Sequence, residues 1–265
     1  MIYIGTSGFS YEDWKGAFYP EDIDKKSMLE YYSQRFQAVE INSTYYTIPS
    51  RATFVSLARR TPQDFKFSVK AHKDMTHAET HSADIFKAFQ DVLEPLIESG
   101  KLGCILAQFP WSFKRTVQNE DRLQEFRDAL RTLPTVVEFR NSEWANDETF
   151  ELLRDLDLGY CCVDEPALRG LMPGIAVSTS NIAYVRFHGR NAKTWWKHEE
   201  AWQRYDYLYT EEELSEWVPK VETLAEETET LYLFFNNHYK GKSATNARMF
   251  AQMLGLELPK PPVSG

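Results

Sequence analysis

The chain has 265 residues, of which 43% are hydrophobic and 14% aromatic, and this content can bury one large core. A formal net charge of −9 and a pI near 5.3 argue against broad attraction to nucleic acid or anionic lipid. No stretch reaches the roughly 20 apolar residues of a membrane span, and no leader-like segment opens the chain. We expect a cytoplasmic protein without membrane partners, whose three cysteines (Cys104, Cys161 and Cys162) are reduced buried thiols.

Short apolar runs recur along the chain, and each has the length of a buried strand rather than that of a helix. Amphipathic stretches separate them, so that the pattern alternates between strand and helix. The eight predicted strands are 2–5, 38–41, 65–69, 102–108, 135–139, 159–163, 182–187 and 231–235.

Helix start signals lie between these runs. Ser50 precedes a predicted helix at 52–60, Ser82 one at 85–99 and Asn146 one at 149–156, while Thr210 and Glu213 form a predicted capping box. We expect a helix after every strand. Eight such repeats in about 250 residues, without a glycine-rich dinucleotide fingerprint, predict a closed (β/α)8 TIM barrel. The barrel is predicted to be one domain, 1–258, followed by a flexible tail, 259–265.

Polar side chains gather where the predicted strands end. Several come in pairs two residues apart, so that both members face one side of the strand. In a barrel, inward residues at the carboxyl ends of the strands line the catalytic mouth. We interpret the set as a site for a polar ligand; the alternative is a structural network of mutually neutralised charges. The set comprises Glu40, Asn42, Lys70, His72, Gln108, Glu138, Arg140, Asp164, Arg186, His188 and Asn236.

Four members of this set are predicted to be catalytic. Glu40, Glu138 and Asp164 are acid/base candidates, because a low-dielectric pocket raises the pKa of one carboxyl while an adjacent arginine holds another ionised. His188 directly follows an apolar run and is the best-placed histidine for proton transfer.

The remaining members are predicted to bind the substrate. Lys70, Arg140 and Arg186 could clamp a phosphate or a carboxylate. For Arg140, the alternative is a simple ion pair with Glu138. Lys70 is also a candidate for a Schiff base, which requires a lowered pKa, whereas nearby carboxylates would raise it. Asn42, His72, Gln108 and Asn236, together with Arg190 after the seventh strand, complete the predicted binding set.

A metal site is an alternative use of the same carboxylates. Glu40, Glu138 and Asp164, with one or two histidines, could form an oxygen-rich site for Mn, Zn or Mg. No HxH or CxxC spacing supports such a site. We therefore name no metal ligands and expect no cofactor.

Aromatic residues are frequent near the predicted strand-to-helix loops, where they could stack on sugars or bases. The segment 189–209 is dense in Trp, Tyr, Lys and Arg, and we predict a lid over the mouth there. The alternative is a surface loop that packs its own aromatic residues. The aromatic candidates are Trp14, Tyr45, Trp111, Trp144, Trp195 and Trp196.

The longest motifs resemble those of one known family. They are GTSGFSYEDWKGAFYP (5–20), VEINSTYYTIPS (39–50), FKFSVKAHKDMTH (65–77), LAQFPWSF (106–113), VEFRNSEW (137–144), YVRFHGRN (184–191) and FFNNHYKGKSATNA (234–247). Nearly end to end, the chain resembles the YecE-like proteins, domain-of-unknown-function family 72. The resemblance implies a TIM barrel without an established activity, and it adds weight to the strand-end residues as the family's polar pocket. Phe9 departs from the family pattern, which more often has Trp there.

Three functions fit these observations. We favour an enzyme that acts on a small anionic or polyhydroxy substrate, such as a sugar phosphate or sugar acid, by carboxylate and histidine acid-base chemistry. The second hypothesis is a metal-assisted phosphodiester hydrolase acting on nucleic acid, a partner that the acidic charge disfavours. The third is a noncatalytic ligand-binding or sensor protein.

Overall fold

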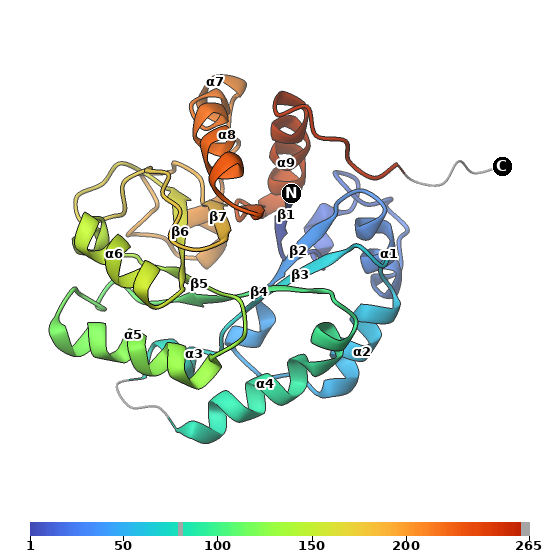
Figure 1. Ribbon diagram of the computed structural model, residues 1–265. Coiled ribbons are helices and arrows are strands. Elements are labelled where there is room, and N and C mark those ends of the chain that lie inside the picture. Colours follow the sequence, from blue (N-terminus) through green and yellow to red (C-terminus); the bar gives the residue numbers. More distant parts are fainter. Residues whose placement is uncertain (79–81, 261–265) are drawn as a thin grey trace.

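Eight parallel strands form one closed barrel. The structure is a computed structural model that describes residues 1–78 and 82–260. Each strand pairs with the next along the chain, and β8 pairs with β1, so that the sheet closes on itself (Figure 1). The predicted barrel class is confirmed. The strands are β1 (Ile2–Ser7), β2 (Ala38–Ile41), β3 (Lys66–Lys70), β4 (Leu102–Gln108), β5 (Thr135–Glu138), β6 (Gly159–Asp164), β7 (Ile182–Phe187) and β8 (Thr230–Phe235).

Helices surround the barrel (Figure 1). The side chains of Ser82 and Asn146 accept backbone N–H groups as N-caps, and Thr210 with Glu213 forms the predicted capping box. The helices are α1 (Met28–Ser33), α2 (Arg51–Arg59), α3 (Lys73–Thr76), α4 (Ala83–Glu98), α5 (Val117–Leu130), α6 (Asp147–Asp155), α7 (Glu211–Ser215), α8 (Val218–Glu227) and α9 (Lys242–Met253). Short 3-10 helices lie at Glu12–Trp14, Lys25–Ser27, Ser43–Tyr45, Ser142–Trp144, Ala201–Tyr205 and Tyr239–Gly241.

One crossover departs from the predicted alternation of strand and helix. Residues 165–181, which connect β6 to β7, contain no helix. Pro166 and Pro173 each lack a backbone donor, and Gly170 has a φ of 83°, in the left-handed region. These residues interrupt a helical hydrogen-bond pattern, so the expectation of a helix after every strand is wrong here.

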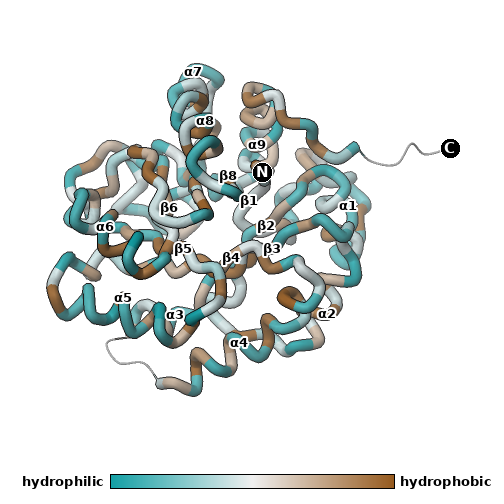
Figure 2. The backbone as a smooth tube through the Cα atoms, viewed as in Figure 1, coloured by the Kyte–Doolittle hydropathy of each residue, from teal (hydrophilic) through white to brown (hydrophobic). Residues whose placement is uncertain are grey.

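The interior of the barrel has two layers of side chains, an aromatic layer and, nearer the carboxyl ends of the strands, a charged layer. Tyr232 on β8 stacks on Tyr3 of β1 with ring centroids 5.3 Å apart, and its ring lies 6.0 Å from that of Tyr184 on β7. Outward side chains pack on the helices. Phe187, for example, packs on Phe250 of α9, with ring centroids 5.3 Å apart. Hydrophobic residues accordingly mark the central strands, and much of the helix ring is hydrophilic (Figure 2). The charged groups lie nearer the carboxyl ends of the strands.

Three smaller predictions concern the rest of the chain. The three cysteines are free and buried, as expected. Among residues 1–78 and 82–260, no helix is both long and apolar enough to cross a bilayer. The last five residues of the predicted tail, 261–265, lie outside the described residues.

The contact between β1 and β2 depends on a glycine. A Cβ atom on Gly5 would lie 2.0 Å from the carbonyl oxygen of Ala38. We predict that Gly5→Ala lowers the free energy of unfolding by about 3 kcal/mol, measured by urea titration, because a closed barrel leaves the strands little room to separate. Gly174→Ala is the control, since its Cβ would come no nearer than 3.7 Å to another heavy atom. Equal losses of unfolding free energy in Gly5→Ala and Gly174→Ala would contradict the close contact between Gly5 and Ala38.

Candidate functional site

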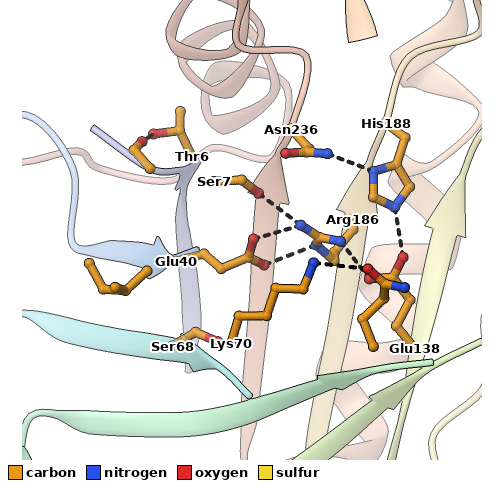
Figure 3. A network of polar contacts seen from close by, with 12 residues as sticks. Thr6, Ser7, Glu40, Ser68, Lys70, Glu138, Arg186, His188 and Asn236 are labelled. Carbon is orange, nitrogen blue, oxygen red and sulfur yellow. Dashed lines mark hydrogen bonds and ion pairs between the residues drawn. The ribbon is translucent and has the colours of Figure 1, made fainter. Parts of the chain in front are cut away.

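A buried arginine joins two buried glutamates inside the barrel. Arg186 on β7 donates to both carboxylate oxygens of Glu40 on β2, with Nε–Oε2 at 2.9 Å and Nη2–Oε1 at 2.7 Å. Its Nη1 donates to Oε2 of Glu138 on β5 at 2.5 Å (Figure 3). The three side chains are at most 2% exposed. The guanidinium therefore supplies the counter-charge that lets both carboxylates be buried.

Tyr184 and Ser68 complete the bonding of Glu40. The Tyr184 hydroxyl donates to Oε2 of Glu40 at 2.7 Å. Because that proton is used, the same hydroxyl accepts from Oγ of Ser68 at 2.8 Å. Burial, together with the nearby Glu40 charge, raises the pKa of Tyr184 well above its ordinary value. Tyr184 is therefore a neutral donor that holds the Glu40 carboxylate.

Three basic side chains converge on Glu138. Besides Arg186, Nε of Arg140 lies 2.7 Å from Oε1, and Nε2 of His188 lies 3.1 Å from the same oxygen. Burial acts to raise the pKa of Glu138, but Arg140, Arg186 and His188 together hold it well below its usual range. The alternative in which Arg140 pairs with Glu138 is confirmed. A carboxylate held in this way is poorly suited to accept a proton near neutral pH.

His188 is fixed in one tautomer. Its Nε2 faces a carboxylate, which can only accept, so Nε2 carries the hydrogen. Nδ1 then accepts from the side-chain amide of Asn236 at 3.1 Å. Burial, aided by the Arg140 charge, lowers the pKa of His188 to about 3. The ring is fully buried and neutral, and it orients Glu138 from beneath the mouth.

Lys70 lies at the end of β3 without an acidic partner. Its Nζ donates to Oε1 of Gln108 at 2.9 Å and lies 4.5 Å from the ring centre of Tyr45. It forms no ion pair with the described residues, because arginines occupy the nearby carboxylates. Burial, and then repulsion by Arg186, lowers the pKa of Lys70 to about 7. Glu138 and Glu40 act to raise this pKa, as expected, but burial and the two arginines outweigh them.

An open pocket lies above this cluster, at the carboxyl ends of the strands. Four cationic side chains line it, and no Asp or Glu of the described part of the chain does, which favours a positive potential inside an acidic protein. We call it the mouth pocket. Its lining comprises Tyr11, Asn42, Tyr45, Tyr46, Lys70, His77, Gln108, Pro110, Trp111, Arg140, Leu171, Arg186, Trp195, Trp196, Ala201, Trp202, Arg204, Tyr205, Asn236 and His238.

The segment 189–209 forms part of the pocket wall, where a lid was predicted. It contributes Trp195, Trp196, Ala201, Trp202, Arg204 and Tyr205. Arg204 is held in place by a hydrogen bond from its Nε to the carbonyl oxygen of Trp195 at 2.9 Å. Sequence reasoning named Trp195 and Trp196 and missed Trp202, Arg204 and Tyr205, although the density of Trp, Arg and Tyr in the segment was a signal. The location is as predicted, whereas a lid motion stays a prediction.

Asp164 and Arg190 lie outside the barrel interior. The Asp164 carboxylate accepts from Nε1 of Trp217 and from the Tyr209 hydroxyl, each at 2.7 Å, and it pairs with Arg190 at 2.7 Å. Trp217 packs on the outward ring of Phe187, 5.4 Å away. Strand side chains alternate, so an error of one residue changes the face. Both residues are therefore away from the mouth pocket, contrary to the prediction.

Glu165 takes the inward position that was expected of Asp164. Its Oε2 lies 3.5 Å from Nη1 of Arg140, and its Oε1 accepts from the backbone N–H of Met172 at 2.9 Å. Burial raises the pKa of Glu165 to about 7, against the opposing effect of Arg140. The sequence pattern does not indicate Glu165, because the apolar run ends at Val163, one residue before β6 does.

Three further candidates have structural roles. His72 is the N-cap of α3, and its Nδ1 accepts from the backbone N–H of Asp74 at 3.3 Å. Trp14 and Trp144 are fully buried, and their indole N–H groups donate to backbone carbonyls. Burial keeps these two rings from stacking on a ligand, in contrast to Trp111 and Trp196.

The carboxylates do not form a metal site. Among the described residues, no group of three or more His, Cys, Asp or Glu side chains is arranged to hold a metal ion. The oxygens of Glu40 and Glu138 face Arg186, and Asp164 lies outside the barrel. The residues proposed for Mn, Zn or Mg therefore do not fit such an ion.

The fold and the site together define a (β/α)8 barrel whose cationic, aromatic-lined mouth lies above a neutralised ionic cluster. Residues 3–264 match the family described as "Protein of unknown function DUF72". The chain belongs to this family, and the resemblance found in its motifs is confirmed.

Relatives cover nearly the whole chain. It is 30% identical to the UPF0759 protein YunF of Bacillus subtilis, over 97% of this chain and 96% of that protein. A solved DUF72 protein from Thermotoga maritima is 44% identical, with 96% and 99% coverage and a TM-score of 0.90. One from Enterococcus faecalis is 28% identical, with full coverage of both chains and a TM-score of 0.88. None of these names states an activity.

Removal of Arg186 tests the buried pairing. We predict that Arg186→Met lowers the free energy of unfolding by about 3–5 kcal/mol, because Glu40 and Glu138 would remain buried without their shared counter-charge. Urea titration at pH 7 would measure the loss. Arg51→Met is the matched control, since its partner Glu94 is 56% exposed, and we expect a change of less than about 1 kcal/mol. Comparable losses in the two variants would count against the pairing.

The neutral state of His188 makes the free energy of unfolding depend on pH. Its pKa is about 3 in the folded protein, against an ordinary value of 6.5. Between these pH values the unfolded chain binds more protons, so the folded state loses stability as the pH falls from about 6.5 towards 3. We predict that His188→Gln flattens this acid slope by up to about 1.4 kcal/mol per pH unit, measured by urea titrations between pH 6.5 and 4.5. Identical slopes would mean that His188 takes up its proton in the folded state.

Proposed function

We propose that the protein is an enzyme that acts on a small anionic substrate with a sugar-like ring, such as a sugar phosphate or sugar acid, bound in the mouth pocket. The charge of the pocket carries this proposal. Arg186 and Arg140 are balanced by the buried glutamates, whereas Lys70 and Arg204 line the pocket without an acidic partner among the described residues. Arg204 is charged at neutral pH, and Lys70, with a pKa of about 7, is partly charged, so the pocket has a surplus of positive charge that favours an anionic group on the ligand.

Exposed aromatic side chains support a ligand that also has a ring face. Tyr46, Trp111 and Trp196 are 72%, 44% and 52% exposed, and all three line the mouth pocket. Nε1 of Trp111 donates to the carbonyl oxygen of Gly170 at 3.0 Å, which fixes the orientation of its ring. Exposed aromatic groups gathered at one cavity mark a binding surface.

Proton transfer falls to groups that line the pocket rather than to the predicted acid-base residues. Glu40, Glu138 and His188 are fully buried and held by other side chains, an arrangement that favours a positioning role. Lys70 lines the pocket, and its pKa of about 7 suits proton exchange near neutral pH. The metal-assisted hydrolase lacks a suitable donor set and is not proposed.

Titration calorimetry with D-ribose 5-phosphate, D-glucose 6-phosphate and D-gluconate tests the proposal. We expect a sugar phosphate to bind more tightly than either inorganic phosphate or the free sugar, because both the cations and the aromatic wall contribute. Arg204→Gln should weaken this binding about tenfold through the loss of a charge-assisted contact. It should leave the melting temperature unchanged, since Arg204 lies outside the buried cluster.

Arg59→Gln, on α2 of the outer ring, is the matched control and should bind as the wild type does. Equal affinity of Arg204→Gln and the wild type for every anion would contradict the proposed site. Tight binding with the ligand recovered chemically unchanged after long incubation would favour the noncatalytic ligand-binding alternative.

A further inference from the structure

We propose that Lys70 is a nucleophile that forms a Schiff base with a carbonyl group of the anionic ligand in the mouth pocket. This inference rests on the proposed function and adds a reaction class to it. The substrates would be anionic aldehydes or ketones, including open-chain sugar phosphates and keto sugar acids.

The position of Lys70 suits a reaction with a bound ligand. Lys70 is the last residue of β3, and its side chain extends towards the centre of the barrel (Figure 3). It lines the mouth pocket together with Arg140 and Arg204. An anionic group held by Arg204, which has no acidic partner among the described residues, would place the rest of a small ligand near the Lys70 amine.

The partners of Lys70 do not require it to be charged. Its Nζ donates to the side-chain oxygen of Gln108, which is neutral. Nε2 of Gln108 donates in turn to the carbonyl oxygen of Phe109 at 2.9 Å, and this bond turns the amide oxygen towards Lys70. Arg186 occupies both oxygens of Glu40, and Arg186, Arg140 and His188 occupy those of Glu138.

The surroundings of Lys70 favour the free amine. Arg186 and Arg140 oppose its positive charge, and Glu138 and Glu40 support it. Burial is the largest effect, and the balance lowers the pKa of Lys70 to about 7. His77 adds no charge at neutral pH, because burial lowers its pKa to about 4. Desolvation and neighbouring cations are the conditions that activate a lysine as a nucleophile.

The reaction balances without an oxidant or a reductant. The lone pair on Nζ attacks the carbonyl carbon, and a C–N bond forms. The carbonyl oxygen takes up the two protons that the nitrogen loses and leaves as water, which gives a C=N bond. The Tyr205 hydroxyl, which lines the same pocket, is a candidate to carry these protons. The imine can then accept electrons from an adjacent breaking bond.

Reductive trapping tests the inference. The probe is glyoxylate, a small anionic aldehyde, with sodium cyanoborohydride at pH 7, and peptide mass mapping locates the secondary amine. We expect Lys70 to be labelled about tenfold faster than the exposed Lys193 and Lys197, with a rate that rises between pH 6 and 8. Lys101 is an internal control: it is buried away from the pocket, bonded to the Ala58 and Thr61 carbonyl oxygens, and should stay unlabelled.

Glycolate separates this inference from the proposed function, because it carries the same carboxylate but no carbonyl. Glycolate should bind in calorimetry and slow the labelling of Lys70, and Lys70→Arg should still bind glycolate but give no adduct at position 70. Glycolate binding without preferential labelling of Lys70 would overturn the Schiff base and leave the anion site standing. Failure of both measurements would overturn both proposals.

Discussion

The pairing of Arg186 with Glu40 and Glu138 is the interaction on which the interior of this barrel depends. The three side chains come from β7, β2 and β5, so the pairing ties strands together across the barrel. Each ion alone would cost several kcal/mol to bury, and removal of one partner leaves the others uncompensated. Tyr184 and His188 supply further hydrogen bonds and Arg140 a second ion pair, so that the carboxylates are fully used in holding the cluster together.

This commitment sets the chemistry of the mouth pocket. Because arginines satisfy the carboxylates, Lys70 is left with a neutral amide as its partner, and Arg204 adds a second cation to the wall. The pocket is therefore cationic in a chain with a net charge of −9. Exposed tryptophans on its rim add a surface for a ring. An anionic, sugar-like ligand matches both features. The Lys70 amine, which lines the pocket, is placed to react with such a ligand.

The sequence predicts the barrel well because strand length and apolar content are local properties. Because side chains alternate between the two faces of a strand, spacing alone also places Glu40, Glu138 and Arg186 in the barrel interior. It fails at Asp164, where a strand that extends one residue further turns the next side chain, Glu165, inward. Pairing across the barrel joins residues that are far apart in sequence, such as Arg186 and Glu40 at 146 positions, and spacing carries no information about it. The roles of the glutamates and the pKa of Lys70 depend on that pairing and on burial, and so they required the structure.

The most direct test of this account is an NMR titration of the Lys70 side chain, followed through its Cε resonance and assigned by the loss of that signal in Lys70→Arg. If Arg186 takes the carboxylates and leaves Lys70 partly buried beside a neutral amide, the resonance titrates with a midpoint near pH 7. A midpoint at the ordinary value of 10.5 or above would mean that Lys70 shares the carboxylates, and it would contradict the charge distribution proposed for the mouth pocket.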